Sequence, residues 1–108
     1  MTVKELAQAK GYKILCMPDE NRVITGGYAG DLLSWVMGRL DADFAWVTIM
    51  SNINIIAVAA LADPACIILS EKVLPDDGVI ERAKEQGVNL LSADNSTFDV
   101  CSDISNLL

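Results

Sequence analysis

Residues 44–70 have the sequence FAWVTIMSNINIIAVAALADPACIILS, which predicts a strand, a helix and a second strand. The largely apolar run Phe44–Met50 predicts a buried strand. The helix predicted over Ile55–Ala62 is apolar on all sides, so it should pack against more than one neighbour. Asp63-Pro64 ends this helix, because the residue before a proline avoids the helical conformation. The next run, Ala65–Ser70, predicts a second buried strand.

A strand, a helix and a strand in this order indicate a parallel pair joined by a crossover helix. The strands are continuous apolar runs rather than alternating ones, which is typical of a sheet covered on both faces. With right-handed crossovers, the sequence predicts an α/β fold, a three-layer sandwich around a mostly parallel sheet of four or five strands.

The flanking segments supply the remaining strands and one loop. Glycine and turn residues separate them. The predicted strands are a buried strand at Lys13–Met17, a short one at Arg22–Thr25 and a last one at Val88–Ser92. Gly26–Gly30 is expected to form a flexible loop.

Four further helices are indicated by their start and stop signals. Thr2 and Glu5 have the spacing of a capping box, and Gly11 ends that helix. Asp31 is expected to cap a helix over Leu32–Leu40. The other predicted helices are an amphipathic one opened by Pro75-Asp76-Asp77 and closed by Gly87, and a C-terminal one from Ser96 to near Leu107.

Length and charge narrow the classes of protein to which the chain can belong. The chain has 108 residues and 52% hydrophobic residues, which predicts one domain over residues 1–108. Fifteen acidic residues against eight basic ones give a net charge of −7, so binding to nucleic acid is not expected. The apolar run Ile53–Ala62 is too short to span a membrane, and the polar N-terminus does not resemble a signal peptide. We therefore expect a cytoplasmic protein.

Catalytic and metal-binding chemistry is not predicted. The chain has no histidine, which removes the commonest general base and the commonest zinc ligand. Cys16 and Cys66 lie in apolar runs and are expected to be buried, whereas Cys101 is expected to be more exposed. No pair of cysteines has metal-site spacing, and no acidic cluster has the spacing of a calcium loop. We predict no enzyme activity, no metal and no cofactor.

The best candidate binding site is the edge of the sheet where the parallel strands end. Polar segments follow three predicted strands there, and helix N-termini offer unpaired amides to an anion. The candidate ligand-binding residues are Gly26, Gly27, Gly30, Asp31, Asn52, Asn54 and Ser70. Two alternatives stay open: Asn52 or Asn54 could cap a helix, and the Asp31 carboxylate could itself fill the anion position.

A small domain with this apolar content has limited interior, so surplus apolar surface favours contact between subunits. We expect a homodimer, and Tyr28 and Trp35 are candidates for its interface.

The block Gly26–Met37, GGYAGDLLSWVM, together with Ala45–Ile49, Asn54–Ala59 and the Ser96-Thr-Phe start, resembles the DRTGG domain in its short stand-alone form. The resemblance covers nearly the whole chain. It implies a parallel-sheet α/β domain that is regulatory or dimer-forming rather than catalytic. The family's name comes from an Asp-Arg pair after one strand and a Thr-Gly-Gly after the next. By position, this chain has Ser51-Asn52 and Ser70-Glu71-Lys72 instead.

We therefore expect a non-catalytic regulatory or interaction domain. Two modes of action are open. In the first, a dimer senses a nucleotide or another small anion at the carboxyl ends of the strands. In the second, the chain is an accessory subunit that docks on a redox or signalling enzyme, since the resemblance also implies an association with hydrogenase subunits.

Overall fold

The computed structural model describes residues 1–108, and helices alternate with strands along most of the chain. The strands are β1 (Lys13–Cys16), β2 (Gly26–Ala29), β3 (Phe44–Thr48), β4 (Cys66–Leu69) and β5 (Leu90–Ser92). The helices are α1 (Val3–Lys10), α2 (Leu33–Arg39), α3 (Asn54–Ala62), α4 (Val79–Gln86) and α5 (Thr97–Leu107).

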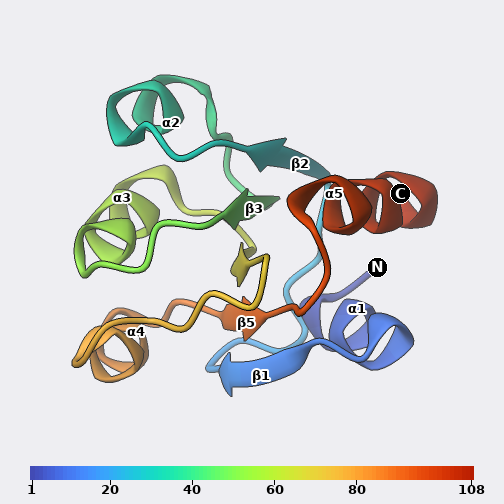
Figure 1. Cartoon of the computed structure of the whole chain (residues 1–108), viewed down its shortest axis with the longest axis horizontal. Helices are drawn as coiled ribbons and strands as arrows, with labels where there is room; N and C mark the ends of the chain where they lie inside the picture. The colour runs from blue at the N-terminus through green and yellow to red at the C-terminus, as the bar shows by residue number, and fades with distance from the viewer.

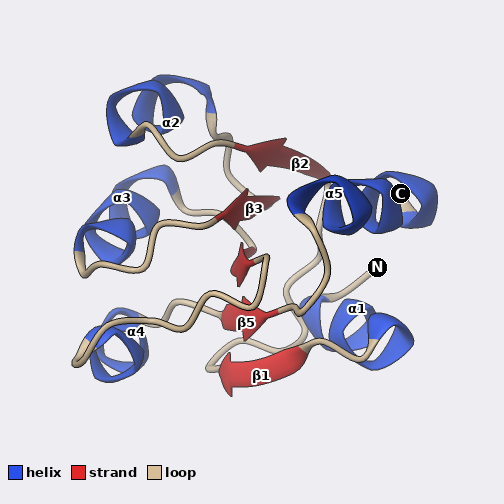
Figure 2. Cartoon of the chain, viewed as in Figure 1, coloured by secondary structure: helices blue, strands red, loops and turns tan.

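The five strands form one sheet in the order β1-β5-β4-β3-β2. Strands β2 to β5 are parallel to their neighbours, and only β1 is antiparallel to β5. Helices α2, α3 and α4 cover one face of the sheet, and α1 and α5 cover the other (Figure 1). Figure 2 shows the strands between these two helical layers. The predicted three-layer α/β sandwich with a mostly parallel sheet is confirmed.

The core has two halves, one on each face of the sheet. One half joins the sheet to α1 and α5 and includes Cys66 and Val100, and the other joins it to α2, α3 and α4 and includes Cys16 and Trp46. Every residue of β4 is buried. This double coverage explains why β3 and β4 have continuous apolar sequences, and it confirms that Cys16 and Cys66 are buried.

Several predicted helix ends are confirmed. The hydroxyl of Thr2 accepts a hydrogen bond from the Glu5 amide at 3.1 Å, and the Glu5 carboxylate accepts one from the Thr2 amide at 2.9 Å. Ser96 caps α5 by accepting from the Asp99 amide. Gly11 and Gly87 end α1 and α4 in the left-handed conformation that glycine adopts without strain.

Two other expectations are wrong in part. The first strand is present, but it is an antiparallel edge strand rather than a buried one, and Ile14 is 50% exposed. Helix α4 starts at Val79 instead of at Pro75-Asp76-Asp77. The backbone amide of Asp76 donates to the Ser51 carbonyl at 2.9 Å, so this segment is held as a loop against the end of β3.

The expected strand at Arg22–Thr25 and the expected loop at Gly26–Gly30 are both wrong. Val23 makes only an isolated bridge with Thr2, whereas Gly26–Ala29 is strand β2, which is paired with β3. The aromatic ring of Phe44 occupies the space beside Gly26 that a Cβ atom would fill. These glycines therefore allow close packing rather than flexibility.

Arg22 organises the opposite edge of the sheet from the predicted site. Its guanidinium donates to Asp43 Oδ1 at 2.9 Å, to Asp63 Oδ1 at 2.8 Å and to the Asp63 carbonyl at 2.7 Å. Both aspartates have positive φ angles, which non-glycine residues rarely adopt. Their carboxylates raise the pKa of Arg22, and the hydrogen bond that the guanidinium donates to Asp63 contributes most. The Arg22 guanidinium thus stabilises two turns in which a non-glycine residue has a positive φ angle.

Tyr12 connects the two helices of one layer. Its hydroxyl donates to Asp103 Oδ2 of α5 at 2.8 Å, and the ring is 5% exposed. Burial raises the pKa of Tyr12, and the bond to the Asp103 carboxylate raises it further. Burial also raises the pKa of the Cys66 thiol to about 12. The fold therefore favours the protonated form of both groups.

We expect Gly26→Ala to lower the free energy of unfolding by about 1–3 kcal/mol, because overpacking forces neighbours to move. The added Cβ would lie 2.6 Å from Phe44 Cε1. Gly38→Ala is the matched control, since no atom lies within 4 Å of its added Cβ. In a helix this change should raise stability by about 0.5–1 kcal/mol. Urea denaturation measures both variants, and an unchanged midpoint for Gly26→Ala would contradict this packing role.

Stability should fall at alkaline pH. The pKa values of Tyr12 and Cys66 are higher in the folded state than in the unfolded state, where they are 10.0 and 9.0. The two groups therefore contribute fully to the free energy of unfolding below these pH values, and the contribution is lost as pH rises above them. We expect Tyr12→Phe to flatten this fall above pH 10.0. Urea midpoints across this pH range provide the measurement, and parallel profiles for Tyr12→Phe and wild type would contradict the assignment.

Candidate functional site

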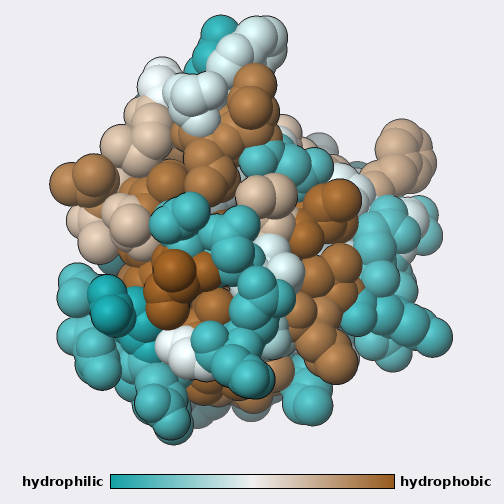
Figure 3. Space-filling view, turned by 60° about the vertical axis from the view of Figure 1, so that its left-hand side comes forward, coloured by the Kyte–Doolittle hydropathy of each residue, from teal (hydrophilic) through white to brown (hydrophobic).

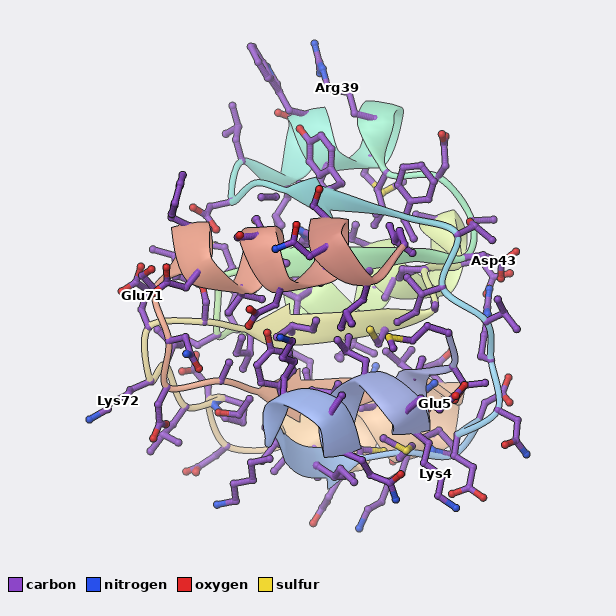
Figure 4. All side chains as sticks on the ribbon, turned by 90° about the vertical axis from the view of Figure 1, so that its right-hand side faces the viewer. Lys4, Glu5, Arg39, Asp43, Glu71 and Lys72 are labelled. Atoms are coloured by element: carbon purple, nitrogen blue, oxygen red, sulfur yellow. The ribbon has the colours of Figure 1, made fainter.

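The carboxyl ends of the parallel strands lie at one edge of the sheet, which we call the carboxyl edge. In Figure 4, Glu71 and Lys72 lie at this edge, and Asp43 lies at the opposite one. The segments that follow the four strands are Gly30–Asp31, Ile49–Asn52, Ser70–Lys72 and Ala93–Ser96. The structure brings five of the candidate ligand-binding residues to this edge, and these are Gly30, Asp31, Asn52, Asn54 and Ser70.

The other two candidates, Gly26 and Gly27, are not at this edge, because they start strand β2. Gly27 instead lines a groove of about 250 Å³ between β2 and α5, which we call the β2–α5 groove. Six of its eight lining residues are hydrophobic, and Cys101, Ile104 and Leu108 of the C-terminal segment are among them. The glycine-rich segment thus contributes to two different places, Gly30 and Asp31 to the carboxyl edge and Gly27 to the β2–α5 groove.

Asp31 joins the ends of β2 and β3 rather than capping α2. Its Oδ1 accepts hydrogen bonds from Thr48 Oγ1 at 2.8 Å and from the Ile49 amide at 2.9 Å. The prediction that it caps a helix is wrong, since the N-cap residue of α2 is Leu32, without a side-chain bond. The alternative that the Asp31 carboxylate fills the anion position at the start of α2 is also wrong, because both of its hydrogen bonds come from the end of β3.

A second carboxylate fills the N-terminus of α5. Glu71 Oε2 accepts from the Thr97 amide at 2.8 Å, at the first residue of the helix. Beside it, the hydroxyls of Ser70 and Thr97 share a hydrogen bond at 2.6 Å. A helix N-terminus attracts an anion through its free amides and its dipole. Here the chain supplies that anion itself.

The turn that carries Glu71 is strained. Glu71 and Lys72 have φ angles of 60° and 61°, in the left-handed region that costs a non-glycine residue about 1 kcal/mol or more. Their amides donate to the carbonyls of Asn95 and Ala93, which holds the turn against the end of β5. Sequence reasoning missed this turn, because neither residue type signals a positive φ.

One of the two expected caps of α3 is confirmed. Asn52 Oδ1 accepts from the amide of Asn54, the first residue of α3, at 2.9 Å, and the intervening Ile53 already has a helical backbone. Nearby, Ser51 Oγ donates to Asp76 Oδ1 at 2.9 Å and ties the end of β3 to the loop before α4. Asn54 is exposed and its side chain forms no hydrogen bond within the chain. The carboxyl edge is thus largely filled by its own side chains.

The thiols offer no activated nucleophile. Burial raises the pKa of Cys16, Cys66 and Cys101 above the ordinary thiol value, so the thiolate form that reacts is disfavoured at neutral pH. No group of three acidic or cysteine side chains is placed to hold a metal ion.

One apolar surface was not identified from the sequence. The outer side of α3 exposes Ile53, Ala57, Ala60 and Leu61, which we call the α3 surface, and Leu61 is 76% exposed. A groove of about 300 Å³ runs between α3 and α4, with Arg82 on its rim. The signal was present in the sequence, since residues 53–62 contain no charged side chain.

None of the helices in the structure has the length and the apolar character that crossing a membrane requires.

Comparison with solved structures gives a match to the CBS and DRTGG domains of the regulatory region of Clostridium perfringens pyrophosphatase, complexed with the activator diadenosine tetraphosphate. The TM-score is 0.74 at 12% sequence identity, which shows a shared fold. The match covers 95% of this chain and 45% of that chain, so this chain spans less than half of its length. No curated protein matches the sequence.

The family comparison gives a clearer result. The model of the DRTGG domain matches residues 29–107, which is well over half of the chain. The match includes β3, β4 and β5 and the whole carboxyl edge. The resemblance noted from the sequence is confirmed, and this chain belongs to the DRTGG domain family.

Proposed function

We propose that this chain is a non-catalytic regulatory domain that works as a homodimer and binds a partner protein through the α3 surface. The observation on which this proposal rests is the exposure of Leu61 and Ile53 on a helix without a charged residue, in a chain with a net charge of −7. Membership of the DRTGG family supports the regulatory role.

Exposed apolar side chains on α3 favour burial by another protein. Leu61 is 76% exposed and Ile53 is 40% exposed, and full burial of such a side chain contributes about 1.5–3 kcal/mol. Hydrophobic surface extends over the side of the molecule formed by α2 and α3, whereas hydrophilic residues prevail around α4 below it (Figure 3). Contiguous apolar surface with a polar border is typical of protein interfaces.

The shape of this surface fits an apolar helix. Ala57 and Ala60 form part of the floor of the groove between α3 and α4, and small residues let a second helix approach closely. Arg82 on the rim is half exposed and pairs with Glu85 at 3.3 Å. A partner helix with an apolar face and a carboxylate at its border would fit the groove and reach Arg82.

The family resemblance implies that the partner is a redox or signalling enzyme, such as a hydrogenase subunit. This chain would be its regulatory or accessory subunit. Docking by apolar contact predicts binding that changes little with ionic strength, because screening acts mainly on exposed charges.

We expect Leu61→Glu to abolish capture of the partner, because it replaces an exposed apolar side chain of the α3 surface with a charge. Leu74→Glu is the matched control, since Leu74 is 69% exposed but lies outside that surface. Tagged wild type and both variants are compared by quantitative affinity purification from cells that express the natural protein. The expected result is a partner retained by wild type and Leu74→Glu and lost with Leu61→Glu.

The complex is then reconstituted from purified components. Leu61→Ala should weaken it about tenfold or more, as removal of an interface anchor does, and the affinity of wild type should vary little with salt. Equal capture by Leu61→Glu and wild type would exclude the α3 surface.

A second candidate function is nucleotide binding at the carboxyl edge. Phe98, which is 81% exposed, follows the N-terminal residue of α5 and offers a face on which a base can stack. The pyrophosphatase region of similar fold was crystallised with diadenosine tetraphosphate. In this chain, a phosphate at the N-terminus of α5 would have to compete with the Glu71 carboxylate for the Thr97 amide.

If nucleotides bind at this edge, we expect Glu71→Gly to raise the affinity for diadenosine tetraphosphate about tenfold, because it removes the competing carboxylate. Lys72→Gly is the matched control: it relieves the same positive φ but leaves Glu71 in place, so it should give no gain. Thermal shift and calorimetry with this nucleotide measure the effect. Absence of binding by wild type and by Glu71→Gly at millimolar nucleotide would exclude this candidate.

A further inference from the structure

Strand β2 leaves one edge of the sheet open. It pairs with β3 on one side and has no strand on the other, and Gly27 and Ala29 are exposed. The other edge strand, β1, is protected in ways that natural sheets use against pairing: it begins with Lys13, its register is irregular between Ile14 and Cys16, and Pro18 follows. Strand β2 has a regular register and no charge, proline or bulge.

Apolar side chains flank the open edge on both sides. On one side, Cys101, Ile104, Ser105 and Leu108 of the C-terminal segment line the β2–α5 groove, at the i, i+3, i+4, i+7 spacing of a single helix face. The acidic residues of α5 lie elsewhere on the helix, since Asp103 is about 200° from Cys101 around its axis.

On the other side of the edge, Trp35 of α2 is 56% exposed, and the Arg39 guanidinium lies 4.1 Å from the centre of its ring. Figure 4 shows Arg39 projecting beyond α2 at this open end of the molecule. The stacked pair is thus available to a neighbour that approaches the edge of β2.

The charges along this edge complement a second copy in one orientation. Asp31 follows the carboxyl end of β2. Arg39 is the last residue of α2, the crossover helix that connects β2 to the parallel strand β3. Because such a helix runs antiparallel to the strands that it connects, Arg39 lies toward the amino end of β2. When two β2 strands lie antiparallel, Asp31 of each copy comes to the end that holds the partner subunit's Arg39. A parallel arrangement would instead place like charges together.

We propose that two copies of this chain pair antiparallel through β2, so that one continuous sheet runs across the dimer. This inference rests on the proposed homodimer and places its interface. The lining of the β2–α5 groove contacts its counterpart across the two-fold axis, and Trp35 packs at the rim. A chain with a net charge of −7 repels its own copies over most of its surface. Residues 23–30 and 32–38 contain no charged side chain, so repulsion between two copies should be weakest along this edge.

The test is sedimentation equilibrium of the full chain at micromolar concentration. Wild type should have twice the monomer mass of 11.6 kDa. Ala29→Lys places a charge on the open edge and should raise the dimer Kd about 100-fold or more. Ile14→Lys is the matched control on the protected edge, where Ile14 is 50% exposed, and it should remain dimeric. Arg39→Glu should weaken the dimer about tenfold, and urea denaturation verifies that each variant is folded.

The outcomes separate this inference from the proposed homodimer. A monomeric wild type would overturn both. A dimeric wild type with a folded, equally dimeric Ala29→Lys would keep the homodimer and overturn the pairing through β2. Loss of the dimer in Ile14→Lys, with Ala29→Lys unaffected, would move the interface to β1.

Discussion

The whole structure depends on one constraint, which is that the central strands must be buried on both faces. Residues of β3 and β4 such as Trp46 and Ile68 are fully buried but lie in opposite halves of the core. A sheet of this kind is stable only when helices cover both sides. In Figure 1 the two helical layers provide this cover. The surfaces proposed for binding are the carboxyl edge, the outer side of α3 and the unpaired side of β2.

At the carboxyl edge, the chain differs from the motif after which the family is named. The resemblance places the glycines of that motif where this chain has Glu71 and Lys72, and both residues have the positive φ that suits glycine. The cost in backbone strain is offset in part by the bond from the Thr97 amide to the Glu71 carboxylate. Asp31 makes a similar bond with the Ile49 amide. Two donors that could hold an anionic ligand are therefore used to hold the protein together.

The three layers of the fold could be predicted from the sequence, whereas the strands and contacts at the edges of the sheet could not. The apolar runs of β3, β4 and α3 leave only one arrangement that buries them, so the sandwich could be predicted. Strand β2 could not, because its glycines signal a loop and their packing role depends on Phe44, which is distant in sequence. The position of the candidate site follows from the parallel sheet, but the contacts that its residues make do not. The partners of Asp31 and Glu71 come from other strands and helices, and no local pattern specifies them.

Arg22 has a consequence for how the molecule opens. Its guanidinium binds both Asp43, just before β3, and Asp63, just after α3, and the Asp43 amide also donates to the Asp63 carbonyl. Fluctuations that release one of these turns must break bonds of the other. The two turns should therefore behave as a single cooperative unit, whose amides acquire deuterium together rather than one by one. The start of the central strand and the end of its crossover helix are in this way coupled through a single side chain.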